Sequence, residues 1–154
     1  MNQNRGFTVI EILFALIILG IAVSIVIISL SKVNDSQVLD RSTVLVASIL
    51  EEARSKTLSA QESSQYGVHL EDSQIVFFRG TSYSPSDPDN VVTEINPRVG
   101  VRDVNLVGGG SDVIFDRLTG QTSQPGILEV YLRASTTMEN IIIIHPTGII
   151  EPAI

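Results

Sequence analysis

The chain has 154 residues, 44% of them hydrophobic, which suffices for one modest domain plus one membrane-spanning segment but not for two full domains. Its formal net charge of −7 disfavours a broad nucleic-acid-binding face, because an acidic surface repels phosphates. The absence of cysteine excludes a disulfide framework and a thiolate zinc site.

Residues 12–30 form an uncharged run, ILFALIILGIAVSIVIISL, between Glu11 and Lys32. These 19 residues are long enough to cross a bilayer as a helix. Fourteen of them are Ile, Leu, Phe or Val. At about −0.3 to −0.6 kcal/mol each, they outweigh the cost of about 2.5 to 3.5 kcal/mol for an acid inside the membrane. A cleavable secretory signal has a shorter core. We therefore predict a membrane-spanning helix over residues 7–31.

The sequence RGFTVIE at residues 5–11 resembles the cleavage and methylation motif of type IV prepilins and pseudopilins. It combines a short polar leader ending in glycine, an aromatic residue, a glutamate at the fifth mature position and a long apolar run. The resemblance implies that a prepilin peptidase removes residues 1–6 by cutting between Gly6 and Phe7, and that Phe7 is then N-methylated. It also implies a single-pass protein of the inner or cell membrane, with its N-terminus cytoplasmic and its head periplasmic or extracellular.

Glu11 has a physical reason to lie in this position. Its carboxylate is one helical turn from the new terminus and can pair with the ammonium of a neighbouring subunit, which offsets the desolvation of both groups. The alternative is a residue at headgroup depth without a role, but acids within membranes are functional by default. We therefore predict that Glu11 is an assembly residue. Gly20 and Ser24 form a small-xxx-small pair for helix packing, a pattern also frequent in other apolar helices.

The lack of proline in this helix indicates which kind of subunit the chain is. Pilins that build long fibres commonly carry a proline near its middle, whereas this sequence has none between residues 7 and 84. This favours a minor pilin or pseudopilin over a major fibre subunit. The resemblance implies other pilins or pseudopilins and an inner-membrane assembly platform as partners. Type IV pili, competence pseudopili and type II secretion systems share these signals.

The rest of the chain predicts a head built on the same helix. Residues 32–62 continue it as an amphipathic segment, and residues 63–154 are rich in strands. The fold class is therefore α+β, with a long N-terminal helix packed on one or two antiparallel sheets. The apolar stripe of the helix consists of Val38, Leu39, Leu45, Val46, Ile49, Leu50 and Ala53. The predicted strands are residues 66–70, 74–79, 91–95, 99–107, 112–116, 127–133 and 140–145.

Two C-terminal segments refine the resemblance. VIFDRLTG at residues 113–120 and IIIHPTG at residues 142–148 are similar to the two strand-turn-glycine segments of H-type pseudopilins and fimbrial minor pilins. Some fimbrial relatives take up DNA and carry an arginine-rich segment after the last glycine. Residues 148–151 contain no arginine, which disfavours DNA binding through such a segment. A DNA-binding tip pilin and a single-pass anchored domain without a filament role remain the alternatives.

Candidate chemical sites in the head are few. His69 and His145 each lie alone in a strand-like run, where a histidine is usually a hydrogen-bonded or edge residue, and no nucleophile-elbow or paired-histidine pattern occurs. We therefore predict a non-enzymatic protein without a cofactor. Residues 84–90 offer Asp87, Asp89 and Asn90 as calcium ligands, but two prolines and a spacing unlike an EF-hand favour a solvated turn. Isolated arginines, such as Arg102 beside Asp103, are usually solvated or paired.

Overall fold

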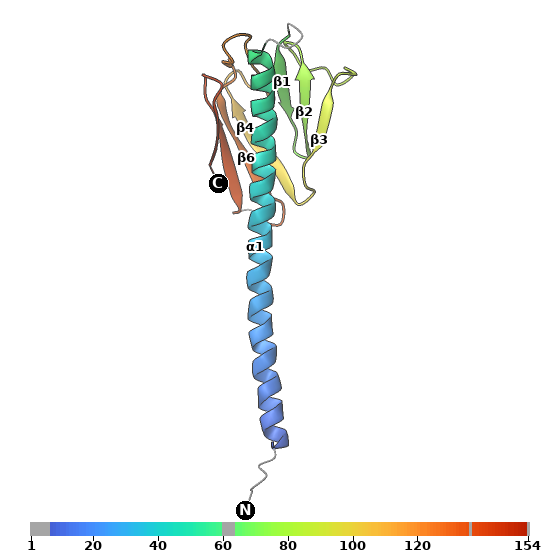
Figure 1. The fold of residues 1–154 in the computed structure, drawn as a ribbon, viewed down its shortest axis with the longest axis vertical. Coiled ribbons are helices and arrows are strands. Elements are labelled where there is room, and N and C mark those ends of the chain that lie inside the picture. The colour runs from blue at the N-terminus through green and yellow to red at the C-terminus, as the bar shows by residue number, and fades with distance from the viewer. Residues whose placement is uncertain (1–6, 60–63, 136, 154) are drawn as a thin grey trace, which may run out of the picture. The chain divides into compact units, whose positions relative to one another are not determined.

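The computed structural model describes residues 7–59, 64–135 and 137–153, without the side chains of residues 25–32. Within these residues, one helix, α1 (Val9–Leu58), is followed only by strands (Figure 1). The strands are β1 (Tyr66–Leu70), β2 (Gln74–Arg79), β3 (Val91–Glu94), β4 (Val99–Leu106), β5 (Asp112–Ile114), β6 (Gly126–Leu132), β7 (Glu139–Ile144) and β8 (Ile150–Ala153). The chain divides into two compact units, Met1–Asp35 and Ser36–Ile154.

The first unit contains the N-terminal half of α1. Across the part of the chain that the structure describes, no helix has the length and apolar character needed to cross a membrane. The membrane-spanning helix predicted over residues 7–31 is therefore not confirmed, and it includes residues 25–31, whose side chains are not described. The predicted leader, residues 1–6, lies outside the described residues.

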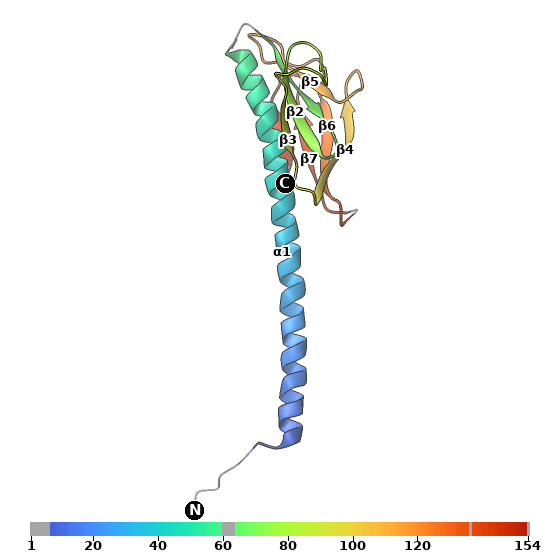
Figure 2. The ribbon, with the colours of Figure 1, turned by 90° about the vertical axis from the view of Figure 1, so that its right-hand side faces the viewer.

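The second unit is an α+β head with two antiparallel sheets, which confirms the predicted fold class. The first sheet has the strand order β3-β2-β1-β5, and the second has the order β4-β6-β7-β8. The C-terminal part of α1 lies across the faces of both sheets, as the two views together show (Figures 1 and 2). One helix thus covers two sheets that have no strand in common.

The core lies between this part of α1 and the two sheets. Leu50 and Ala53 of the helix are fully buried, as are Val68 of β1 and Val130 of β6, and they belong to one continuous hydrophobic cluster. Residues three and four apart share one side of a helix, so the apolar stripe points inward along this whole segment. The predicted stripe is confirmed: Leu39, Val46, Ile49, Leu50 and Ala53 are buried, and Val38 and Leu45 pack against the cluster.

The seven predicted strands are all present, with ends that differ by one or two residues. Residues 71–73 form the turn between β1 and β2, where Glu71 N–H donates to the carbonyl of Gln74 at 3.1 Å and closes the hairpin. The eighth strand, β8, was not predicted. Its sequence, IEPA, contains a proline, which is compatible only with an edge strand or a bulge, and β8 is indeed an edge of the second sheet.

Candidate functional site

The start of α1 carries the predicted processing and assembly residues. Glu11 N–H donates to the carbonyl oxygen of Thr8 at 3.1 Å and to its Oγ1 at 3.3 Å, and Ile12 N–H donates to the same carbonyl at 3.2 Å. Thr8 is therefore the N-cap, and Phe7 precedes the helix. The sequence Thr-x-x-Glu is the pattern of a capping box. This signal is contained in the sequence alone.

The N-cap explains why Glu11 is well placed for pairing. It lies in the first turn of α1, where unpaired backbone N–H groups give the helix a positive end that favours a carboxylate. Its side chain lines an open hollow of about 400 Å³ together with Phe7, Ile12, Ala15 and Leu16. Phe7 is 80% exposed, so the carboxylate lies at the helix start among apolar side chains that a partner can cover.

The predicted packing pair lies further along the same unit. Ser24 Oγ donates to the carbonyl of Gly20 at 2.8 Å, so the hydroxyl is satisfied within the helix. A Cβ added at Gly20 would meet nothing within 4 Å, which leaves bare backbone on the helix surface there. This geometry is compatible with close approach of another helix, and the role of the pair stays a prediction. Gly6, the other side of the predicted cleavage point, lies outside the described residues.

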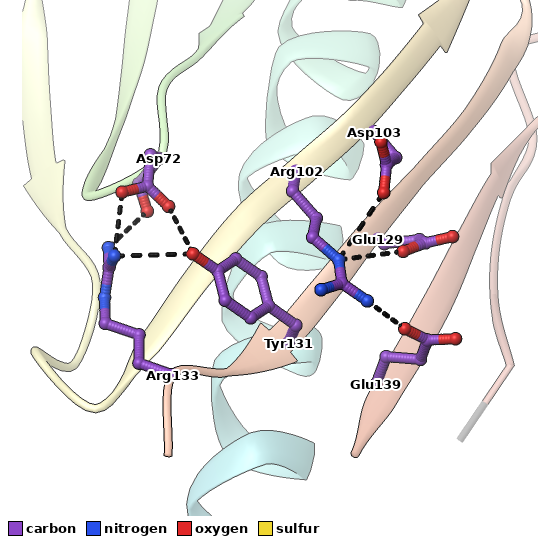
Figure 3. Close-up of polar contacts among 7 residues, drawn as sticks. All are labelled: Asp72, Arg102, Asp103, Glu129, Tyr131, Arg133 and Glu139. Carbon is purple, nitrogen blue, oxygen red and sulfur yellow. Dashed lines mark hydrogen bonds and ion pairs between the residues drawn. The ribbon is translucent and has the colours of Figure 1, made fainter. Parts of the chain in front are cut away.

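In the head, Asp72 connects the two sheets through the β1–β2 turn (Figure 3). Its carboxylate accepts an ion pair from Arg133 Nη1 at 2.8 Å and a hydrogen bond from the Tyr131 hydroxyl at 3.2 Å. Its backbone carbonyl accepts from Val101 N–H of β4 at 3.1 Å and from Arg133 Nη2 at 3.1 Å. A Cβ on Gly100 would overlap the side chains of both Asp72 and Tyr131, so a larger residue there would require this contact to shift.

Arg102 of β4 is at the centre of a second cluster, which lies on the second sheet. Its Nε contacts Glu129 at 3.1 Å and Asp103 at 3.5 Å, and its Nη2 pairs with Glu139 (Figure 3). The guanidinium also lies 4.7 Å from the centre of the Tyr131 ring, within cation–π range. The hydrogen bond that Arg102 donates to Glu129 raises the pKa of Arg102 above its ordinary value, despite the opposing effect of desolvation, and Glu139 adds to the rise. Of the two states expected for Arg102, solvated or paired, the structure shows the paired one, and Asp103 is one of three carboxylates around it.

The two histidines are hydrogen-bonded, as predicted. His69 Nδ1 lies 2.5 Å from Asp112 Oδ1, and its ring stacks on Tyr83 with 4.0 Å between centroids. His145 Nε2 lies 3.0 Å from Glu151 Oε2. Within residues 7–59, 64–135 and 137–153, no group of three acidic or histidine side chains is arranged to hold a metal ion.

The loop weighed for calcium is built by its own hydrogen bonds. Asp89 pairs with Arg79 at 2.6 Å, and its N–H donates to Asp87 Oδ1 at 2.9 Å. Asn90 Nδ2 donates to the carbonyl of Ser84 at 2.7 Å. The three side chains proposed as ligands thus stabilise the turn itself, and a calcium-bound form of this loop stays a hypothesis.

The two strand-turn-glycine segments come together at the C-terminal end of α1. Thr122 N–H, just beyond the first segment, donates to the carbonyl of Pro146 in the second at 3.1 Å. Arg54 Nε of α1 donates to the carbonyl of Gly120 at 3.4 Å, and the Leu58 side chain packs over Gly120. These segments therefore fix the end of the helix to both sheets, which gives the motif a structural role.

Comparisons with known proteins agree with this geometry. Residues 1–29 match the model of the prokaryotic N-terminal methylation motif. No curated protein sequence gives a significant match to the chain.

Among solved structures, the fold is similar to that of the type IV minor pilin FimU from Pseudomonas aeruginosa strain PAO1 in two crystal forms. One has a TM-score of 0.56 and 12% sequence identity, and covers 75% of this chain and 92% of that one. The other has a TM-score of 0.55 and 12% identity, and covers 73% and 86%. The resemblance to type IV pilin-like proteins drawn from the sequence is thus confirmed in the N-terminal motif and in the fold of the head.

Proposed function

We propose that this chain is a minor pilin or pseudopilin, a non-enzymatic structural subunit of a type IV pilus or of a type II secretion-like filament. The observation that carries the proposal is the position of the methylation motif on the structure. The motif spans residues 1–29, and it places Phe7 directly before the N-cap of α1 and Glu11 in the first turn. A prepilin peptidase removes residues 1–6, and the new amino group of Phe7 is methylated.

In this proposal the helix first anchors the subunit in the membrane and then joins it to neighbouring subunits of the filament. Residues 7–31 hold the processed subunit in the inner or cell membrane as a single pass, with the head on the outer side. On assembly, the Glu11 carboxylate pairs with the amino group of a neighbouring subunit. Charge pairing matters here because the surrounding side chains are apolar, so an unpaired carboxylate would be costly once they are covered. Gly20 gives a neighbouring helix room to approach.

The head surface supports a role in contacts with other proteins. The guanidinium of Arg102 has three carboxylates around it, and that of Arg133 is paired with Asp72. Neither therefore offers free positive charge to a phosphate backbone, and the net charge of −7 opposes nucleic-acid binding further. The partners we propose are the other pilins or pseudopilins of the same filament and its inner-membrane assembly platform.

Substitution of Glu11 tests the assembly role. In cells that build the filament, we expect Glu11→Ala and Glu11→Gln to remain in the membrane fraction and to disappear from sheared filaments, because each removes the charge that pairs with the amine. The matched control is Glu52→Ala, which removes an exposed carboxylate from the same helix. Incorporation of both Glu11 variants at the level of the control would contradict the proposal and favour an anchored domain without a filament role.

A further inference from the structure

The two sheets have four edge strands, and three of them are blocked within the described residues. At β4, Val101 N–H is occupied by the carbonyl of Asp72, and a register shift between Arg102 and Asn105 interrupts the strand. At β5, the side chain of Gln124 accepts from Ile114 N–H at 3.3 Å. At β8, Pro152 supplies no backbone donor. Proteins commonly use such features to prevent edge strands from pairing with other chains.

The fourth edge, β3, has none of these features. Its only strand neighbour is β2, and its side chains Val91 and Val92 are 57% and 53% exposed. Ile95 N–H donates to the carbonyl of Ser73 at 3.0 Å, so Ile95 faces β2. Successive residues of an antiparallel strand direct their backbone N–H and C=O groups alternately toward and away from the neighbouring strand. The backbone groups of Val92 and Glu94 therefore point away from β2. No described residue is hydrogen-bonded to that side of β3.

The surroundings of this edge define the charge of a suitable partner. Glu94 is exposed and forms no ion pair with any described residue, whereas Asp89 in the preceding loop is already paired with Arg79. Glu94 also lines an open hollow of about 360 Å³ with Ser73, Gln74, Ile95, Pro97 and Arg133. A lysine or arginine that enters this hollow beside Glu94 would gain an ion pair there. A second copy of this chain would instead bring like charges together.

We propose that β3 is a docking edge to which an extended segment of another protein adds as a fifth strand. Backbone hydrogen bonds at Val92 and Glu94 supply the pairing, as in other cases of strand addition. Specificity comes from β-branched side chains that pack beside Val92 and from a basic side chain opposite Glu94. The proposal concerns the head alone and does not depend on cleavage, on Glu11 or on filament assembly.

Binding of two short peptides to the full chain in detergent tests the inference. The probes are end-blocked, fluorescently labelled peptides of sequence KTVTVKV and ETVTVEV, and the readout is fluorescence anisotropy. We expect the basic peptide to bind about tenfold more tightly than the acidic one, the factor that corresponds to one favourable charge contact. Equal binding of the two peptides, or no binding of the basic one, would overturn the proposal.

Variants then locate the site on β3. Val92→Pro removes an outward N–H while keeping the residues that face β2, so we expect binding to weaken about tenfold, equivalent to one lost hydrogen bond. Glu94→Lys should reverse the preference between the peptides. Glu151→Lys on β8 makes the same charge change at another edge and should leave the preference intact. Binding that is unaffected by both β3 variants would refute the assignment.

Two further measurements cover the remaining outcomes. If Val92→Pro fails to fold by circular dichroism, a basic peptide with N-methylated backbone amides removes the donors from the probe instead, and its undiminished binding would count against strand addition. Sedimentation of the unliganded chain addresses self-pairing. A dimer that is abolished by Glu94→Lys or Val92→Pro would assign the edge to a second copy and would overturn the commitment to a basic partner.

Discussion

Gly148 is in direct contact with Gly120, although the two positions are 28 apart in the sequence. A Cβ placed on Gly148 would overlap the carbonyl oxygen of Gly120, and both glycines have positive φ, 78° and 64°. Arg54 of α1 donates to the same carbonyl. The final glycines of the two strand-turn-glycine segments therefore meet at one point beneath the end of the helix. The contact explains why the second segment ends in glycine, and the first does so because a Cβ on Gly120 would meet the Leu58 side chain.

Substitution of Gly148 should destabilise the head strongly. Gly148→Ala adds a methyl group where the Gly120 carbonyl lies, in a backbone conformation that costs a non-glycine residue about 1 kcal/mol or more. Together with the overlap, we expect a loss of about 3 kcal/mol in the free energy of unfolding, measured by urea denaturation. Gly108→Ala is the matched control, since Gly108 has φ of 90° but open space around its Cβ position. Equal losses for the two variants would contradict the importance of the contact.

The contact between Asp72 and Arg133 should couple the two sheets only modestly. Both side chains are partly exposed, so solvent screening limits the strength of their ion pair. A double-mutant cycle of Asp72→Ala and Arg133→Ala should give a coupling energy of about 0.5 to 1 kcal/mol in urea denaturation. A coupling energy of zero would mean that the backbone contacts of Asp72, and not its carboxylate, hold the sheets together.

The contribution of Arg102 to the stability of the head should persist at alkaline pH. Its pKa is raised in the folded state, so its contribution is present below the unfolded pKa and is lost only as the pH rises through a still higher folded value. A lysine has an ordinary pKa of about 10.4, so Arg102→Lys should lose stability relative to the wild type between pH 8 and about pH 11. Denaturation of both proteins at the two pH values measures the difference. A constant difference would show that the charge of residue 102 does not stabilise the fold.

The sequence predicted the elements well because their signals are local. The apolar stripe around Leu50 and the alternation in β6 each follow from the period of one element. The N-terminal motif is likewise contiguous, so Phe7 and Glu11 could be recognised without a structure. The Thr8 cap is equally local, because Thr-x-x-Glu at a helix start is the pattern of a capping box and needs no structure to be recognised.

The sequence could not predict contacts between distant segments. Nothing near Asp72 indicates that it meets Arg133, which lies 61 residues further on. The blocked edges of the sheets depend on strand order, and strand order emerges only when the whole head has folded. The free edge at β3 is visible for the same reason only in the structure. β8 was missed because a proline in a short terminal segment argues against a strand unless the strand is known to be an edge.

The mature N-terminus of the protein tests the central claim most directly. When the full precursor is expressed together with a prepilin peptidase, intact-mass and N-terminal peptide mass spectrometry should find a chain that begins at Phe7 and carries an N-methyl group. A Gly6→Leu precursor, processed in parallel, should keep its leader. A wild-type chain that retains residues 1–6, or that begins at any residue other than Phe7, would contradict the account.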